Sequence, residues 1–303
     1  METSPRARIL VCVPAFNESK NISDIVNRCK KYADEVLVYD DGSKDDTQQL
    51  AMLAGATVIR SPENKGYGVA IRSLFHAAKQ KNADIMITLD SDGQHNPDQI
   101  PPMIETLKQG FDIVIGSRFL RRDDKDKVPK FRSFGIKTIT KLTQVASYKD
   151  ITDSQSGFRA YNKNALSKIN LYEDGMAVST EILLRAGEKK LAVAEVPITI
   201  NYDTDDTSTL NPITHGIGVL YSVFQFISLR HPLAFYGLPG IALLGIAAYF
   251  IKHALNLFSQ SGYVSTNLIL VSVGIAVVGV VLLATAAIVY TLIALLKGRV
   301  NNV

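Results

Sequence analysis

Three oxygen-bearing side chains stand at every second position of the stretch ITLDSDGQHNPDQIP, residues 87–101. They are Asp90, Asp92 and Gln94, and they follow a strand-like apolar run directly. In extended chain, alternate residues share one face, so the spacing predicts that the three oxygens converge on a single point. Hard divalent cations prefer oxygen ligands, and that point could therefore hold one.

Short apolar runs rich in β-branched residues alternate with helical patterns along residues 8–202. Strands are predicted at residues 8–16, 35–43, 57–61, 84–90, 111–118 and 191–202, and helices at residues 21–33, 46–56, 66–81, 97–110 and 175–190. This alternation predicts an α/β fold with an open, mostly parallel sheet and helices on both of its faces.

Polar clusters stand where these strands end, which is where ligands bind in such sheets. The clusters are Asn17 and Glu18, Asp40 and Asp41, Asp90 to Gln94, and Ser117 with Arg118. Asp and Gly are ordinary turn formers, so one cluster alone would mean little. Four clusters at the same edge indicate a binding site.

Known phosphate-binding motifs do not account for the glycines in NKGYGVA. Ile71 occupies the third glycine position of the dinucleotide fingerprint, and the chain has no Gly-Lys-Ser/Thr phosphate loop. Gly66 and Gly68 are therefore expected to shape the tight start of a helix. Lys65 is a candidate phosphate contact.

The C-terminal region is apolar enough to cross a membrane twice. No charged residue occurs at residues 232–251 or 254–296, and about 20 apolar residues span a bilayer core. Arg230 precedes the first span, Lys297 and Arg299 follow the second, and Lys252 alone lies between them. The positive-inside bias then predicts a helical hairpin with both ends in the cytoplasm, and a cytoplasmic N-terminal region.

Charge and cysteine content exclude other classes. The chain has two cysteines, Cys12 and Cys29, which is too few for a disulfide framework. The net charge of +4 is mild, and no RNA-type or zinc-finger motif accompanies it, so nucleic acid is not an expected partner.

A set of motifs resembles family 2 glycosyltransferases, in particular the polyprenyl-phosphate sugar synthases such as dolichyl-phosphate mannose synthase. The motifs are VPAFNE, VYDDGSKDDT, ENKGYGVA, LDSDGQHNP, VIGSRF and DSQSGFRAY, and their order and spacing match over nearly all of residues 8–200. The resemblance implies a GT-A fold, a nucleotide-diphosphate-sugar donor, Mg²⁺ or Mn²⁺, and inversion at the anomeric carbon.

The resemblance also assigns residues to the donor side of the site. Asp90 and Asp92 match the family's Asp-x-Asp pair, Ser91 lies between them, and Gln94 matches a metal-contacting glutamine. The residues implied to contact the nucleoside are Pro14, Phe16, Glu18, Asp40 and Asp41.

On the acceptor side, a lipid phosphate is mostly dianionic at neutral pH because its second pKa lies near 6. It is already a nucleophile, so the enzyme must neutralise and align two phosphate groups rather than supply a strong base. Arg118 is expected near the reaction centre, and Arg132 and Ser133 match the position where mannose synthases hold the lipid phosphate. Ser156 is a further candidate there, and Asp153 is a candidate for orienting the acceptor or its cationic partners.

One departure leaves the donor open. Mannose synthases carry an Arg and a Lys soon after the EVPI strand, whereas no Lys or Arg occurs at residues 191–229 here. A UDP-sugar is therefore an alternative to GDP-mannose. A non-catalytic, membrane-anchored nucleotide-sugar binding protein is another alternative, as is a glycosyltransferase with another lipid or a polysaccharide as acceptor. Processive synthases use a Gln-x-x-Arg-Trp motif, and this chain has no Trp.

The expected domain organisation follows from these patterns. Residues 1–210 would form the cytosolic GT-A domain, and residues 232–303 the two transmembrane helices with a short cytosolic tail. Between them, apolar residues recur at helical spacing in residues 211–231, which predicts an amphipathic helix at the membrane interface. The protein would be an integral protein of the cell or endoplasmic reticulum membrane.

Overall fold

The computed structural model describes residues 6–120, 140, 150–175, 177–200, 224, 228 and 231–300, with side chains as far as residue 293. The chain divides into two compact units, residues 1–223 and residues 224–303. The predicted domain limit at residues 210 and 211 lies among residues 201–223, outside the described part, as does almost all of the predicted interface helix. Both therefore stay predictions.

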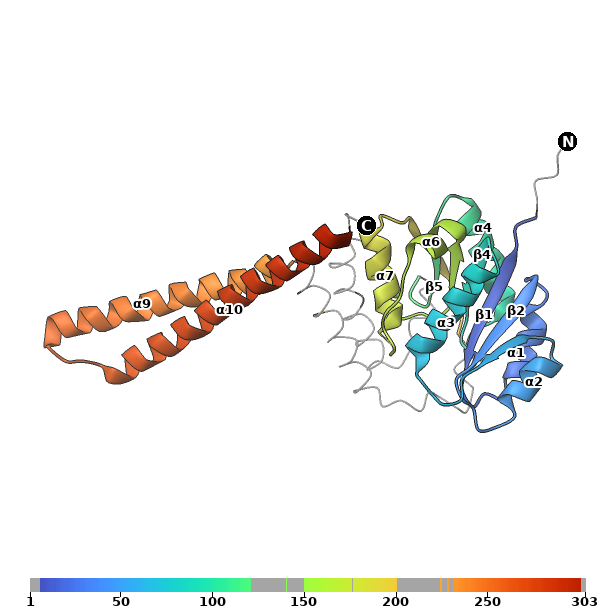
Figure 1. Cartoon of the computed structure of the whole chain (residues 1–303), viewed down its shortest axis with the longest axis horizontal. Helices are drawn as coiled ribbons and strands as arrows, with labels where there is room; N and C mark the ends of the chain where they lie inside the picture. The colour runs from blue at the N-terminus through green and yellow to red at the C-terminus, as the bar shows by residue number, and fades with distance from the viewer. Residues whose placement is uncertain are drawn as a thin grey trace. The chain divides into compact units, whose positions relative to one another are not determined.

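One sheet runs through the first unit (Figure 1). In the described residues its strands are β1 (Ile9–Ala15), β2 (Glu35–Asp40), β3 (Thr57–Arg60), β4 (Ile85–Thr88), β5 (Ile113–Ser117), β6 (Arg159–Asn162) and β7 (Val193–Pro197). Their spatial order is β3-β2-β1-β4-β6-β5-β7. All neighbouring strands pair in parallel except β6, which is antiparallel to both β4 and β5. The predicted open, mostly parallel sheet is confirmed.

Helices cover both faces of this sheet, as expected. Among the described residues of the first unit, the helices with defined bounds are α1 (Ile22–Cys29), α2 (Thr47–Leu53), α3 (Tyr67–Gln80), α4 (Ile100–Lys108), α6 (Lys163–Lys168) and α7 (Val178–Glu188), and a short 3-10 turn (Pro97–Gln99) precedes α4. Core residues of α3, α6 and α7 belong to one buried cluster, and those of α1, α2 and α4 belong to another. Strand residues alternate between the two clusters, because successive side chains point to opposite faces.

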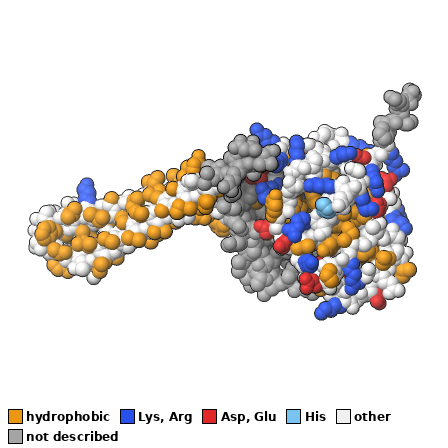
Figure 2. All heavy atoms as spheres, viewed as in Figure 1, with side chains coloured by type: hydrophobic (Ala, Val, Ile, Leu, Met, Phe, Trp, Pro, Cys, Tyr) orange, Lys and Arg blue, Asp and Glu red, His pale blue; other side chains and the backbone are white. Residues whose placement is uncertain are grey.

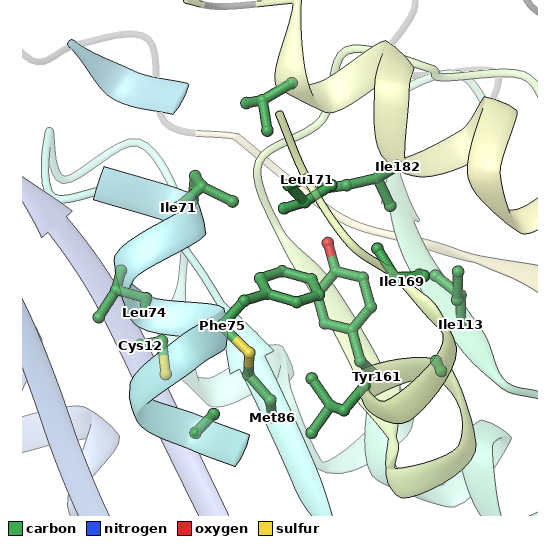
Figure 3. Packing of buried hydrophobic residues seen from close by; sticks show 14 of the residues in the cluster. Cys12, Ile71, Leu74, Phe75, Met86, Ile113, Tyr161, Ile169, Leu171 and Ile182 are labelled. Carbon is green, nitrogen blue, oxygen red and sulfur yellow. The ribbon is translucent and has the colours of Figure 1, made fainter. Parts of the chain in front are cut away.

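Figure 3 shows the cluster beneath α3. Phe75 of α3 meets Tyr161 of β6 edge to face, with ring centroids 4.9 Å apart, and Met86 and Cys12 pack beside them. Both Phe75 and Tyr161 are almost fully buried. Aromatic pairs of this kind add about 0.5–1.5 kcal/mol beyond the area they bury, so the pair ties α3 firmly to the middle of the sheet.

The second unit contains two long apolar helices, α9 (Leu238–Ser261) and α10 (Thr266–Val300), with a π-helical turn (Leu233–Gly237) before α9. Two segments, Leu233–Ser261 and Thr266–Ile293, are long and apolar enough to cross a membrane, and hydrophobic side chains dominate their visible surface (Figure 2). The helices pack through small residues: a Cβ at Gly240 would lie 3.0 Å from the Gly279 carbonyl oxygen. Glycines at a crossing allow such close backbone approach.

Candidate active site

The carboxyl ends of β1 and β4 lie side by side at the centre of the sheet. The chain proceeds from β1 to β2 and β3 on one side, and α3 then carries it back to β4 on the other side of β1. Such a switch in strand order opens a crevice where ligands bind. The loop after β4 is joined directly to the end of β1, because the Ser91 hydroxyl donates to the Pro14 carbonyl oxygen at 2.8 Å. The predicted clusters after the first and fourth strands are thus brought together.

Asp90 is held at this edge between a tyrosine and a glycine. The Tyr67 hydroxyl donates to Asp90 Oδ1 at 3.0 Å, and burial, followed by the charge of Asp90, raises the pKa of Tyr67 well above its usual value. On the other side, a Cβ at Gly157 would lie 2.3 Å from Asp90 Oδ2. His95 Nδ1 lies 3.7 Å from the same oxygen. About a third of the Asp90 side chain stays exposed, so a ligand can reach it.

Asp92 and Gln94 do not continue a strand, so the prediction of an extended chain with three oxygens on one face is wrong in its geometry. β4 ends at Thr88, and Gly93 has a φ of +75°. Asp92 Oδ1 accepts a hydrogen bond from the Gln94 backbone N–H at 3.0 Å, which closes an Asx-turn. The turn leaves Asp92 partly exposed and Gln94 buried.

Asp40 and Asp41, at the carboxyl end of β2, accept hydrogen bonds from backbone amides. Asp41 accepts hydrogen bonds from the Lys65 and Gly66 amides at 2.9 and 2.8 Å. Asp40 Oδ1 accepts from the Ser43 amide at 3.0 Å, and Asp40 Oδ2 lies 3.4 Å from Arg60 Nη1. Both acids are buried, so they shape the loops at this edge. The Lys65 side chain, in contrast, is exposed.

The loop after β1 is tied to the loop after β2. Asn17 takes a positive φ of 57°, its amide donates to the Ser43 hydroxyl at 2.9 Å, and its side-chain oxygen accepts from the Lys44 amide at 2.9 Å. The Glu18 amide donates to the Thr47 hydroxyl. Phe16 is 37% exposed at the same loop, so its ring is available to a ligand.

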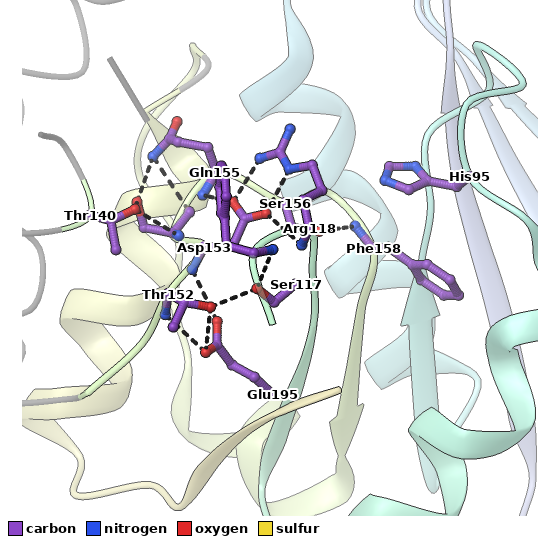
Figure 4. Close-up of polar contacts among 12 residues, drawn as sticks. His95, Ser117, Arg118, Thr140, Thr152, Asp153, Gln155, Ser156, Phe158 and Glu195 are labelled. Carbon is purple, nitrogen blue, oxygen red and sulfur yellow. Dashed lines mark hydrogen bonds and ion pairs between the residues drawn. The ribbon is translucent and has the colours of Figure 1, made fainter. Parts of the chain in front are cut away.

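Arg118 and Asp153 form a buried ion pair (Figure 4). Arg118 Nε lies 2.6 Å from Asp153 Oδ2 and Nη2 lies 2.6 Å from Oδ1, and the Arg118 amide donates to Oδ2 at 3.2 Å. Burial alone would raise the pKa of Asp153, but the charge of Arg118 and its hydrogen bonds outweigh burial and lower it. Arg118 and Asp153 are 35 positions apart in the sequence. They meet because β6 is antiparallel to β4 and β5, so the segment before β6 lies at the edge of the sheet where β4 and β5 end.

Glu195 of β7 holds the segment that carries Asp153. Its carboxylate accepts hydrogen bonds from the Thr152 amide at 2.8 Å, the Thr152 hydroxyl at 2.9 Å and the Asp153 amide at 3.0 Å. The Thr152 hydroxyl also lies 2.6 Å from the Ser117 hydroxyl. Burial raises the pKa of Glu195, and these hydrogen bonds only partly oppose it. The position of Arg118 therefore depends on a chain of contacts that reaches β7.

Of the acceptor-side candidates, Ser156 is buried and its hydroxyl accepts from the Phe158 amide at 3.3 Å. Arg132 and Ser133 lie outside the described residues.

Three residues that contact the candidate site residues had no site role in the sequence analysis. They are Tyr67, Thr152 and Glu195. Gly157 belongs to the motif DSQSGFRAY, but nothing in the sequence indicates that it lies next to Asp90.

Oxygen ligands for a divalent cation are available at this edge. No group of three or more His, Cys, Asp or Glu side chains within the described ranges is placed to hold a metal ion. Asp90 and Asp92 are two partly exposed carboxylates two positions apart. Mg²⁺ is commonly bound by one or two carboxylates, with water and substrate phosphates completing its coordination. The donor set fits a cation of that kind.

Comparison with known proteins agrees with this architecture. The model of the family described as glycosyl transferase family 2 matches residues 10–169. The UDP-N-acetylglucosamine–dolichyl-phosphate N-acetylglucosaminyltransferase of Methanococcus voltae is 29% identical over 238 residues, which cover 72% of this chain and 95% of that protein. The dolichol-phosphate mannosyltransferase of Pyrococcus furiosus is 32% identical over 234 residues, which cover 74% of this chain and 62% of that protein.

A solved structure shares the fold. Glucosyl-3-phosphoglycerate synthase of Mycobacterium tuberculosis, crystallised with Mn²⁺, UDP and phosphoglyceric acid, has a TM-score of 0.57 and 19% identity. The match covers 73% of this chain and 78% of that one. The predicted GT-A type of sheet is confirmed by this neighbour.

Proposed function

Because the chain belongs to glycosyl transferase family 2, we propose that this glycosyltransferase moves one sugar from a nucleotide-diphosphate sugar to dolichyl or another polyprenyl phosphate. One observation carries the choice of acceptor. The two relatives from Methanococcus voltae and Pyrococcus furiosus are named for different sugars, yet both names contain the same phosphorylated lipid. The acceptor is thus their common element.

The proposed donor site lies at the carboxyl ends of β1, β2 and β4. Pro14, Phe16 and Glu18 would flank the nucleoside, and Asp41, with Asp40 beside it, would accept hydrogen bonds from it. Lys65 would contact a phosphate, and Ser91 would offer a backbone contact. Both GDP-mannose and a UDP-sugar remain candidates, because the two relatives are named for mannose and for UDP-N-acetylglucosamine.

Asp90, Asp92 and Gln94 would hold Mg²⁺ or Mn²⁺. When bound, such a cation neutralises charge on the departing nucleoside diphosphate. The chain's own contribution is to keep the carboxylates in place: Tyr67 and Gly157 confine Asp90, and the Asx-turn with the Gln94 amide confines Asp92. Preorganised groups of this kind avoid reorganisation at the moment of reaction.

Arg132, Ser133 and Ser156 would bind and align the acceptor phosphate, and Arg118 would lie near the reaction centre, where it meets the phosphates. Arginine suits this role because its planar guanidinium recognises phosphate oxygens through paired hydrogen bonds. Asp153 would hold Arg118 in orientation rather than take a proton, since its pKa is lowered and it remains ionised at neutral pH. Direct attack of the phosphate on the anomeric carbon in a single displacement gives inversion there.

The membrane part of the proposal explains how the lipid reaches the site. The helices α9 and α10 would anchor the chain as an integral membrane protein, and residues 211–231 would lie along the interface. The basic residues Arg230, Lys297 and Arg299 would keep both ends of the hairpin, and with them the catalytic unit, on the cytoplasmic side of the cell or endoplasmic reticulum membrane. The polyprenyl chain can then stay in lipid while its phosphate enters the crevice.

Sugar transfer by the purified full-length protein tests the proposal. We would offer a panel of GDP- and UDP-sugars with dolichyl phosphate, with and without EDTA, and use Asp92→Asn as the inactive control. We expect product from one donor, loss of product with EDTA, and loss of product in the variant. No product from any donor, with metal and lipid phosphate present, would refute the proposed acceptor.

A further inference from the structure

The position of Tyr67 is fixed from both sides along the chain. The backbone amides of the two preceding residues donate to the Asp41 carboxylate at 2.9 and 2.8 Å. On the other side, the Gly68 amide donates to the Asp174 carbonyl oxygen at 3.0 Å. A Cβ at Gly68 would lie 2.4 Å from the Asp174 carbonyl carbon, so only glycine permits this approach. Tyr67 therefore starts α3 at a defined place.

From that place the hydroxyl of Tyr67 reaches one oxygen of Asp90. It donates to Oδ1 at 3.0 Å, and Gly157 lies so close to the same carboxylate that a Cβ there would come within 2.3 Å of Oδ2. A carboxylate held only by its own rotamer preference would sample several orientations. The half-buried tyrosine donor on one oxygen and the close approach of Gly157 reduce the number of these orientations.

The segment of residues 65–67 thus contacts both ends of the proposed donor site. Its amides bind Asp41, at the end assigned to the nucleoside, and its tyrosine binds Asp90, at the end assigned to the cation. Three consecutive residues therefore link the two ends of the site through hydrogen bonds.

We propose that Tyr67 is a positioning residue for divalent cation binding: its hydroxyl orients the Asp90 carboxylate toward the cation, an inference that rests on the proposed function. Hydrogen bonds to the ligands of a metal orient them, and their removal commonly weakens metal binding roughly 10- to 100-fold. Tyr67 touches neither sugar nor phosphate in this role. Its effect passes through Asp90.

Mn²⁺ titration of the full-length protein in detergent tests this role. Free Mn²⁺ is followed by electron paramagnetic resonance, in the presence of UDP and, separately, of GDP. The test variant is Tyr67→Phe, which removes one oxygen and keeps the ring. The matched control is Tyr161→Phe, which removes the hydroxyl of a neighbouring tyrosine that is 1% exposed and packs against Phe75.

We expect Tyr67→Phe to raise the Mn²⁺ dissociation constant roughly 10- to 100-fold and Tyr161→Phe to leave it unchanged. Sugar transfer by Tyr67→Phe should recover at saturating Mn²⁺, which a general loss of structure would not allow. Unchanged Mn²⁺ affinity in Tyr67→Phe, or equal weakening in both variants, would overturn the inference. Absence of sugar transfer by the wild-type protein would instead overturn the proposed function, so the two failures are distinguishable.

Discussion

Replacement of Asp153 by Asn probes the buried ion pair that holds Arg118. The Asp153 side chain is fully buried and that of Arg118 is 7% exposed. Asn keeps the shape but removes the charge, and its amide group would point a donor at either Nε or Nη2 of Arg118. Removal of one partner from a buried ion pair costs about 3–5 kcal/mol. For a unit of this size, each kcal/mol lowers the Tm by about 2–4 °C, so we expect a decrease on the order of 10 °C.

The pH dependence of this loss has a defined sign. The folded pKa of Asp153 is lowered, so the stability it contributes is fully present above its unfolded pKa, about 3.9, and is lost only as the pH falls through the lower folded value. The difference in Tm between wild type and Asp153→Asn should therefore be full at neutral pH. It should shrink only in strongly acidic buffer.

Thiol exposure offers an assay confined to the first unit. Cys12 and Cys29 are the only cysteines of the chain and both are completely buried in its core, so a thiol-reactive dye reports unfolding of that unit and not of the hairpin. Asp24→Asn is the matched control, because it makes the same change in an exposed pair with Arg28, where about 0–1 kcal/mol is expected. Equal Tm values for Asp153→Asn and wild type would refute the reasoning.

Three further changes test other contacts. Gly157→Ala places a Cβ 2.3 Å from Asp90 Oδ2, so the carboxylate must move, and we expect about a 100-fold lower initial rate of sugar transfer; a rate near that of wild type would show that Asp90 tolerates the shift. Asp41→Asn leaves two loop amides with one good acceptor, and it should cost about 1–3 kcal/mol in the thiol-dye assay; an unchanged midpoint would contradict the anchoring role. Gly240→Leu meets the Gly279 carbonyl oxygen at 3.0 Å, and the hairpin should lose about 1–3 kcal/mol by far-UV circular dichroism in detergent; unchanged melting of the helices would refute that crossing.

The sequence predicts the fold well where hydrophobic periodicity is strong. The runs that become β1, β2 and β4 have apolar centres because both faces of the sheet are covered. The sequence did not predict β6, since Arg159–Asn162 has only two apolar residues between polar ends and no β-branched residue. Its antiparallel direction follows from pairing with β4 and β5, which is a long-range property that local pattern does not contain.

In the candidate site, too, the sequence predicts which residues gather at the edge of the sheet but not how they are arranged there. The acids after the strands could be found from their position, since parallel strands end at one edge. Their local geometry could not, because the Asx-turn at Asp92 and the positive φ of Gly93 replace the expected extended chain. The contact between Tyr67 and Asp90 joins residues 23 positions apart, and no spacing rule points to it.

A comparison of acceptors shows most directly whether the protein glycosylates a lipid phosphate. With whichever donor proves active, we would compare dolichyl phosphate, dolichyl diphosphate and unphosphorylated dolichol as acceptors, and identify the products by mass spectrometry. We expect one added sugar on dolichyl phosphate and no product with dolichol, because the phosphate is the nucleophile. Efficient transfer to unphosphorylated dolichol, or addition of several sugars in succession, would contradict this expectation.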